Sequence, residues 1–371
     1  MTSVTAKEQL SAAESVVIKV GSSLLTHDHA LRTPWLASLA ADIGALIAAG
    51  KRVTVVSSGA VALGRTASDF VDSSDALSEK QARAAIGQIQ LAEGWRLALS
   101  THSIPAAQIL LTPDDTEDRQ RYLNARDTLD ALASVGAVAI INENDTVATE
   151  ELRYGDNDRL AARVASMIGA DLLILLSDVD GIYDTDPSLD ANAEHIPLVR
   201  SIDEPLWASA GDSRSAVGTG GMRSKLMAAS IAVTNGIPVV LSSGHNDPPI
   251  SSILKGGRCT VFLSEASRRS ARRQWIAASL RREGKLILDR GAADAVRARK
   301  SLLPIGVTSI EGDFSRGDCV TLMLDNQEIG VGVVRVDASA ARSMLADAKA
   351  GARTGVLVHS DDLVPNAKEL T

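Results

Sequence analysis

The chain has 371 residues, of which 45% are hydrophobic and only 3% are aromatic. This length exceeds that of one average domain, so we expect two unequal units with cores built from Ala, Val, Ile and Leu. The 38 basic and 46 acidic residues give a net charge of −8, which argues against broad, nonspecific binding of nucleic acid. An anionic ligand therefore requires locally placed lysines and arginines.

The cysteine content and the apolar runs indicate the compartment. Cys259 and Cys319 are far apart and neither belongs to a CxxC pair, so no disulfide framework or zinc knuckle is predicted. The first fifteen residues include charged side chains instead of the unbroken apolar run of a signal peptide. The longest apolar stretches are too short to span a bilayer. We expect a cytoplasmic protein without a membrane partner.

Short β-branched runs alternate with alanine-rich helical patterns through the first two-thirds of the chain. Strands are predicted at residues 16–20, 53–57, 106–110, 138–142, 172–176 and 239–241. Helices are predicted at residues 33–49, 79–100, 124–134, 158–169 and 221–235. Continuous apolar strands are covered on both faces, so the pattern predicts an α/β sandwich with a mostly parallel sheet. Ligands of such sheets bind beyond the carboxyl ends of the strands.

The character of the sequence changes around residues 264–284, where arginines cluster. Short strands follow at residues 285–288, 305–310, 319–324, 329–336 and 356–359, with turn signals between them. This pattern predicts a small β-barrel with a little helix. We place a first domain at residues 1–265, a basic linker at 266–283 and a second domain at 284–371. The arginine-rich stretch at residues 268–282 either contacts RNA or forms a solvated or ion-paired helix between the domains, and the helix is favoured.

The glycine-rich run Gly218–Lys225 ends on a lysine, and Lys19 stands in a matching context near the N-terminus, after the apolar run at residues 16–18. Glycines allow backbone N–H groups to approach phosphate oxygens, because no Cβ atom stands in the way. A lysine adds a mobile positive charge. Two such elements on one sheet predict a site that holds both sides of a phosphoryl group during its transfer.

Ser58 and Gly59 follow a predicted strand and precede a helical turn. The run Gly59–Thr66 nearly fits a P-loop, but Arg65 stands where that motif has lysine, and residues 60–64 have a helical pattern. The resemblance to a P-loop is therefore judged spurious. Backbone N–H groups at the start of a helix still make Ser58 and Gly59 candidates for holding a carboxylate.

Two clusters rich in Asn and Asp occur at residues 142–145 and 155–158, the first directly after an apolar strand. Turn formation and helix capping are one reading of both clusters, and Asp158 is in position to cap a helix. The functional reading is that carboxylate and amide oxygens bind an ammonium group. An amino-acid substrate requires such an anionic corner beside a donor-rich corner.

A third polar segment, beginning at Ser177 and Asp178, follows another apolar strand. It is either an acidic surface loop or a contact to the ribose or base of a nucleotide, and its acids suit Mg²⁺ held through water. The pair His27 and His29 is weak evidence for metal binding, so we predict no metal site made by the protein alone. We also find no order of residues typical of a hydrolase triad.

The motifs together resemble those of bacterial glutamate 5-kinases over roughly residues 15–362. The motifs that carry the resemblance, in order, are Lys19–Ser23, Ser58–Ala60, Leu123–Leu129, Ile141–Asp145, Gly155–Asp158 and Gly218–Lys225. Leu302–Gly306 and Gly312–Asp318 resemble the PUA domain that many of these kinases carry. Ser22 and Ser177 stand where Thr is common, and both keep a hydroxyl group.

The resemblance implies a three-layer sandwich of the amino acid kinase type followed by a PUA-like domain. It implies transfer of the γ-phosphate of ATP, with Mg²⁺, to the side-chain carboxylate of L-glutamate, the first step of proline biosynthesis. It also implies a homo-oligomer, dimer or tetramer, that proline inhibits at or near the glutamate site.

Residue roles carry over by the same resemblance. Lys19 and Lys225 flank the transferred group, and Asp158 positions them. The implied glutamate-binding residues are Ser58, Gly59, Asn142, Asp145, Asp156 and Asn157. The implied ATP-binding residues are Lys19, Ser177, Asp178, Thr219, Gly220, Gly221, Met222, Arg223, Ser224 and Lys225.

Two alternatives are weighed against this hypothesis. The first is a kinase of the same fold that acts on acetylglutamate or aspartate, which the PUA-like tail and the Leu123–Leu129 motif disfavour. The second is an RNA-binding PUA protein with an inactive kinase body. The retained lysines disfavour it, as does the balance of 11 basic and 12 acidic residues in 284–371.

Overall fold

The computed structural model describes residues 5–65, 77–147, 157–190, 192–209, 221–264 and 282–366. The chain divides into two compact units, Met1–Ala266 and Ser267–Thr371, and each has its own hydrophobic core. Most of the predicted basic linker, residues 266–283, lies outside the described residues. The first strand of the second unit, β13, begins at Arg282.

The first unit is built on an eight-stranded sheet in the order β10-β12-β11-β7-β1-β4-β6-β5. Its strands are β1 (Ser15–Val20), β4 (Arg52–Ser57), β5 (Ala106–Leu111), β6 (Val138–Glu143), β7 (Leu172–Ser177), β10 (Leu198–Val199), β11 (Val239–Ser243) and β12 (Cys259–Phe262). Neighbouring strands are parallel except β11 and β12, which are antiparallel. The predicted mostly parallel sheet is confirmed, and the six predicted strands lie within the observed ones. Strand β12 was not predicted.

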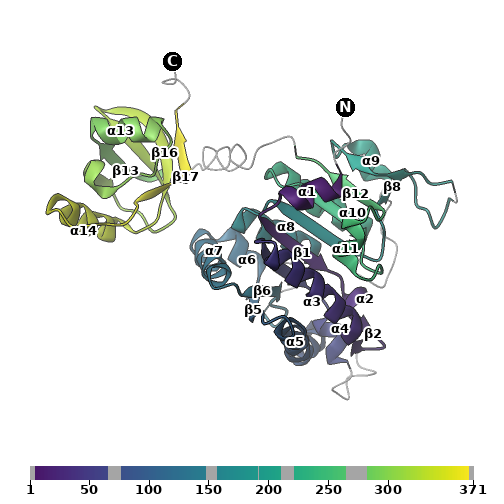
Figure 1. The fold of residues 1–371 in the computed structure, drawn as a ribbon. Helices are drawn as coiled ribbons and strands as arrows, with labels where there is room; N and C mark the ends of the chain where they lie inside the picture. Colours follow the sequence, from purple (N-terminus) through teal and green to yellow (C-terminus); the bar gives the residue numbers. More distant parts are fainter. Residues whose placement is uncertain are drawn as a thin grey trace. The chain divides into compact units, whose positions relative to one another are not determined.

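Helices cover both faces of this sheet (Figure 1). Those in the first core are α1 (Ala6–Ala12), α2 (Ser22–Leu25), α3 (Thr33–Ala48), α4 (Ala60–Gly64), α5 (Leu77–Ser100) and α11 (Pro249–Leu254). Those in the second core are α7 (Arg119–Ser134), α8 (Asn157–Ile168), α9 (Glu204–Ser209) and α10 (Met222–Thr234). The remaining short elements are α6 (Pro113–Glu117) and the hairpins β2–β3 (Thr26–His27, Ala30–Leu31) and β8–β9 (Ile182–Tyr183, His195–Ile196). The three-layer sandwich is confirmed.

The period of two along β1 sends alternate side chains to the two cores. Val16, Ile18 and Val20 pack in the first core, whereas Val17 packs in the second with residues of α8 and α10. Lys19 therefore shares its face of the sheet with Val17 and is directed towards α8 and α10. The strand is buried along its whole length, so this lysine reaches the interior of the unit.

The second unit contains a five-stranded sheet in the order β14-β13-β15-β16-β17. Its elements are β13 (Arg282–Leu288), α13 (Arg290–Arg297), η2 (Pro304–Gly306), β14 (Val307–Gly312), β15 (Cys319–Leu324), β16 (Gln327–Val334), α14 (Ala338–Lys349) and β17 (Val358–Pro365). The strand-rich character agrees with the prediction. The two helices were not predicted individually, and each begins at an aspartate whose side chain accepts from a backbone N–H, Asp289 for α13 and Asp337 for α14.

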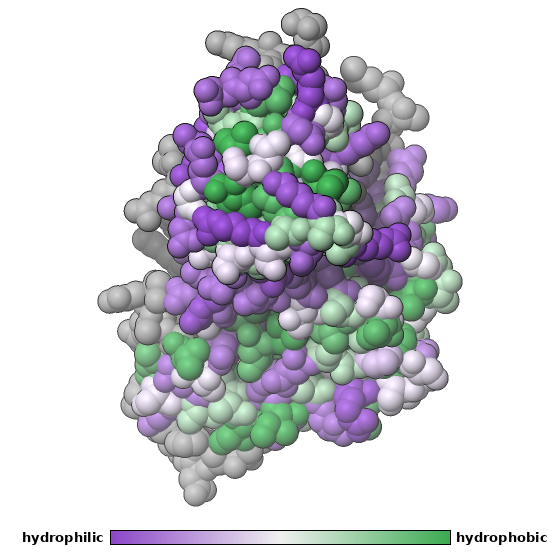
Figure 2. Space-filling model, turned by 90° about the vertical axis from the view of Figure 1, so that its left-hand side faces the viewer, coloured by the Kyte–Doolittle hydropathy of each residue, from purple (hydrophilic) through white to green (hydrophobic). Residues whose placement is uncertain are grey.

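The surface mixes residue types. On the face drawn in Figure 2, patches of hydrophobic side chains alternate with hydrophilic ones. Single exposed hydrophobic residues such as Ile89 and Leu189 are ordinary on protein surfaces. Among the helices that the structure describes, none is long and apolar enough to span a membrane.

Candidate active site

Lys19, Asp158 and Lys225 meet in the interior of the first unit. The Nζ atom of Lys19 lies 2.5 Å from Oδ1 of Asp158, and the Nζ atom of Lys225 lies 3.2 Å from Oδ2 of the same carboxylate. Asp158 is 1% exposed and each lysine is 5% exposed. One carboxylate thus binds two ammonium groups, one from strand β1 and one from helix α10.

The sequence places these three groups by simple local rules. Lys19 is directed to the α8 side of the sheet by its place in β1, Asp158 is in the first turn of α8, and Lys225 is in the first turn of α10. Buried like charges repel and are costly unless they are neutralised. Here the carboxylate of Asp158 pairs with both ammonium groups, and Lys225 also interacts electrostatically with Asp178, so two cationic side chains are held close together in the interior.

The start of α10 presents its backbone to the same region. Gly221 is the N-cap of α10, and its carbonyl accepts from the backbone N–H of Ser224 at 3.0 Å. The N–H groups of the helix that precede Ser224 have no carbonyl four residues earlier in the helix to donate to, so they suit phosphate oxygens. Thr219 and Gly220, also assigned to ATP binding, lie outside the described residues.

The neighbouring side chains of this segment differ in their surroundings. Met222 is partly buried against the second core, whereas Arg223 is exposed. The guanidinium of Arg223 lies 5.8 Å from the ring centroid of Trp207 in α9, within the range of a cation–π contact. The buried Oγ atom of Ser224 has no hydrogen-bond partner among the described residues.

Ser58 and Gly59 connect β4 to α4, as the sequence predicted. Gly59 is the N-cap of α4 and has φ +112°, a left-handed backbone conformation that residues other than glycine rarely adopt. Residues 60–64 form α4, which confirms the helical reading over the P-loop. The backbone N–H of Ser58 donates to Val20 at the end of β1, 3.1 Å away.

The Asn-rich clusters meet in a chain of buried amides. Asn157 Nδ2 donates to Oδ1 of Asn142 at 2.8 Å and to Oγ of Ser58 at 2.7 Å. Three of the residues assigned to glutamate binding are therefore joined directly although they lie far apart in the sequence. Asp145 follows β6 in a turn and lines a pocket of about 220 Å³. Asp156 lies outside the described residues.

Ser177 is the last residue of β7, and Asp178 follows it close to Lys225. The Oγ atom of Ser177 donates to Oδ1 of Asp178 at 2.7 Å. Partial burial raises the pKa of Asp178, but this hydrogen bond and the positive charge of Lys225 outweigh burial, so the pKa lies below its ordinary value. The carboxylate is thereby kept ionised close to the lysine cluster.

The structure adds residues that the sequence analysis missed. Gln88 in α5 accepts from Nδ2 of Asn142 at 2.8 Å, and nothing in the helical pattern marks it. His245 follows β11, and its electrostatic interaction with Asp178 contributes to the lowered pKa of that carboxyl group. The rule that ligands bind beyond the carboxyl ends of strands, applied to β11 as well, points to Ser243 and His245.

Comparisons with known proteins decide the family. The model of the amino acid kinase family matches residues 14–243, and that of the PUA domain matches residues 284–350. The chain belongs to the amino acid kinase family. Its curated relatives within that family include the glutamate 5-kinase of Paramagnetospirillum magneticum, 48% identical over 96% of this chain and 98% of the relative. Another is glutamate 5-kinase 1 of Rhizobium meliloti, 49% identical over 98% of this chain and 94% of the relative.

Among solved structures, the UMP kinase of Ureaplasma parvum matches with a TM-score of 0.48 and 15% identity, over 67% of this chain and 98% of that one. The family resemblance expected from the sequence motifs is confirmed by the curated relatives. The matches to these curated relatives span nearly the whole chain, including both units.

Proposed function

We propose that this chain transfers the γ-phosphate of ATP to the side-chain carboxylate of L-glutamate and so forms γ-glutamyl phosphate. The observation that carries the proposal is the buried cluster in which Lys19 and Lys225 bind the two oxygens of Asp158. Near-full-length similarity to curated glutamate 5-kinases supports the choice of substrate. The roles of single residues in binding glutamate and ATP are part of the same proposal.

The chemistry requires positioning more than proton transfer. A carboxylate is already a nucleophile at neutral pH, so no general base is needed. The obstacle is the approach of an anion to a highly charged nucleotide, and phosphoryl transfer is accelerated mainly by alignment and by stabilising charge on the transferred group. Lys19 and Lys225 supply that charge, and Asp158 sets the distance between them. The N-terminus of α10, from Gly221 to Lys225, binds the phosphates.

The substrate amino acid lies at the amide chain. Ser58, Gly59, Asn142 and Asn157 hold the glutamate, with Asp145 facing its ammonium group and Asp156 nearby. The bonds among Ser58, Asn142 and Asn157 support this grouping, because they bring the three side chains together without any ligand.

Mg²⁺ accompanies the nucleotide. It is held mainly by phosphate oxygens and water and requires few protein ligands. Asp158 is neutralised by two lysines and is a poor ligand, whereas the ionised Asp178, joined by Ser177, fits the role. When bound, the ion neutralises phosphate charge. Inhibition by proline near the glutamate site and assembly into a dimer or tetramer are further parts of the proposal.

The test is a hydroxylamine-trapping assay with ATP, in which an acyl phosphate is converted to a stable hydroxamate. L-glutamate, L-aspartate and N-acetyl-L-glutamate are compared at equal concentrations. We expect hydroxamate and ATP consumption to be greatest with L-glutamate. A preference for aspartate or acetylglutamate contradicts the substrate assignment, and no turnover with any of the three contradicts the kinase assignment.

A further inference from the structure

Among the described residues that line the pocket of Asp145, Gln88 has a buried polar atom without a partner. Gln88 is 8% exposed, and its Nε2 atom has no hydrogen-bond partner among the described residues. Burying an amide N–H without an acceptor destabilises the protein, because the group loses its hydrogen bonds to water. Such a group is therefore expected to meet an acceptor that the described residues do not provide, such as a bound ligand.

The orientation of the Gln88 amide follows from a backbone donor. The backbone N–H of Glu143 donates to Asn142 Oδ1 at 2.9 Å, and a backbone N–H can only donate. The other end of the Asn142 amide is therefore its NH₂ group, which donates to Gln88 Oε1 at 2.8 Å. Hence the Gln88 oxygen faces Asn142, and its NH₂ group is the end left for the pocket.

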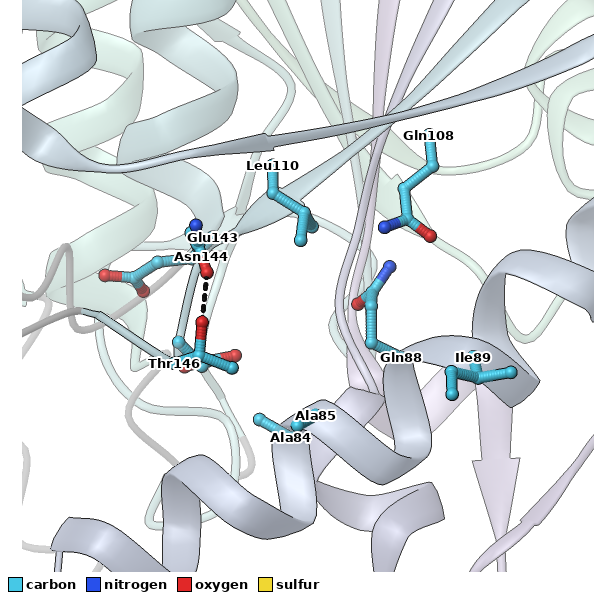
Figure 3. A pocket seen from close by; sticks show the side chains of 10 residues that line it. Ala84, Ala85, Gln88, Ile89, Gln108, Leu110, Glu143, Asn144 and Thr146 are labelled. Atoms are coloured by element: carbon cyan, nitrogen blue, oxygen red, sulfur yellow. Dashed lines mark hydrogen bonds between the residues drawn. The ribbon is translucent and has the colours of Figure 1, made fainter.

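Figure 3 shows this geometry, with the Gln88 amide rising from α5 towards the strands and Asn144 and Thr146 across the pocket. The pocket has about 220 Å³, below the roughly 300–1,000 Å³ typical of drug-sized ligands. Ala84, Ala85 and Leu110 supply apolar walls. A molecule the size of an amino acid suits this space.

The charges of the pocket are arranged for a zwitterion. Glu143 at the end of β6 and Asp145 in the turn after it line the pocket, and Gln88 lines it from α5, with the Gln108 amide of β5 near its own (Figure 3). An ammonium group pairs with the acidic side, and a carboxylate accepts from the amide. Both groups occur on the α-carbon of an amino acid.

We propose that Gln88 is a specificity-determining, substrate-binding residue whose Nε2 donates to the α-carboxylate of the amino-acid substrate. The inference deepens the proposed function and rests on it. Gln88 does not touch the transferred phosphoryl group, because it acts on the opposite end of the substrate. Its bond to Asn142 fixes the donor in place, so little conformational freedom is lost when the carboxylate binds.

The experiment pairs a side-chain change with a matching change of substrate. Gln88→Met removes the amide at nearly constant volume, and 4-aminobutyrate is glutamate without its α-carboxylate. A hydrogen bond to a charged group contributes about 1.5–3 kcal/mol, so we expect kcat/KM for L-glutamate to fall roughly 10- to 100-fold in Gln88→Met. The KM for ATP and the kcat/KM for 4-aminobutyrate stay within about twofold. Where 4-aminobutyrate turns over too slowly, its Ki against glutamate replaces kcat/KM.

Three further variants and a control sharpen the test. Gln88→Glu keeps an oxygen for Asn142 but turns an oxygen towards the substrate, so we expect a larger loss for glutamate than in Gln88→Met. Gln90→Met makes the same change on an exposed position of the same helix and leaves both substrates unaffected. Gln88→Leu serves if Gln88→Met fails to fold, as judged by circular dichroism. Gln88→His, a shorter side chain that still carries a ring N–H donor, restores part of the glutamate activity.

The outcomes separate this proposal from the proposed function. Equal losses for glutamate and 4-aminobutyrate in Gln88→Met show that Gln88 only supports Asn142, and they overturn the inference. A normal kcat/KM for glutamate in that variant also overturns it. Both results leave the kinase assignment intact, because wild-type formation of γ-glutamyl hydroxamate tests that assignment separately.

Discussion

Lys19 and Lys225 bind opposite oxygens of one buried carboxylate, although one lysine stands in the first strand of the chain and the other in the tenth helix. Their ammonium groups are held by Asp158 at contact distance on both sides. A transferred phosphoryl group carries its charge on equatorial oxygens, and two cations with fixed spacing stabilise that charge without rearranging.

Removal of either lysine tests this arrangement. We expect Lys19→Ala and Lys225→Ala each to lower kcat by about 10²–10³, the loss typical of one transition-state donor. Lys255→Ala, at an exposed position after α11, is the control and keeps normal kcat. Steady-state assays with saturating ATP and glutamate measure the effect. Near-normal kcat in a folded Lys225→Ala protein contradicts the role assigned to that residue.

Asp158→Asn tests the neutralising role of the carboxylate. It removes the negative charge that both buried ammonium groups bind, and breaking a buried ion pair in this way costs about 3–5 kcal/mol. We expect the free energy of unfolding, measured in urea without ligands, to fall by this amount. The exposed Asp130→Asn in α7 is the control and changes stability little. Equal unfolding curves for wild type and Asp158→Asn mean that the cluster is solvated rather than buried.

The pH dependence of stability tests the ionised state of Asp178. Its pKa in the folded protein lies below the ordinary value of 3.8. The folded state therefore binds the proton more weakly than the unfolded state, so the stabilisation is present above about pH 4 and is lost as the pH falls through the folded pKa. We expect wild type to exceed Asp178→Asn in unfolding free energy at pH 6 and the difference to shrink at pH 3. A difference that grows on acidification contradicts the sign of the shift.

Close packing of α4 against α5 yields a prediction for Gly87. A Cβ atom on Gly87 lies 1.9 Å from the carbonyl oxygen of Ala60, so the two helices must separate. We expect Gly87→Ala to lower the free energy of unfolding by about 1–3 kcal/mol, as overpacking does. It also raises KM for glutamate, since α4 follows Gly59 and α5 carries Gln88.

A second glycine supplies the matched control. Gly44 lies in α3, and in Gly44→Ala the atoms nearest to the new Cβ belong to the side chain of His102, the first at 3.3 Å. That change keeps KM for glutamate and alters stability by less than the Gly87 change. Thermal melts and glutamate titrations of both variants make the comparison. Identical melting temperatures for Gly87→Ala and wild type contradict the close helix contact.

The elements of the first unit were predictable because each is defined by local pattern. The apolar runs at β1, β6 and β7 are buried on both faces, which produces continuous hydrophobic segments that can be recognised in the sequence. Strand β12 is only four residues long, and strands of that length carry little periodic signal. The sequence predicted a little helix in the second unit but did not place α13, which has only eight residues between strands.

The candidate site was predictable to the extent that its residues follow strands or begin helices. Ser58, Asn142 and Ser177 stand at carboxyl ends of parallel strands, where the topology of the sheet gathers ligand-binding groups. Gln88 and Trp207 were not predictable in this way. They lie inside helices, and their significance depends on which side chain from another element they meet.

Sequence by itself determined the residue types at this site, the alternation that turns Lys19 towards α8, and the family to which the chain belongs, because these depend on local spacing and on motifs in fixed order. Tertiary structure alone decided which groups share a partner. That Asp158 binds both lysines, and that the Gln88 amide is oriented by Asn142, follow from contacts between segments distant in the chain, and such contacts exist only once the helices pack on the sheet.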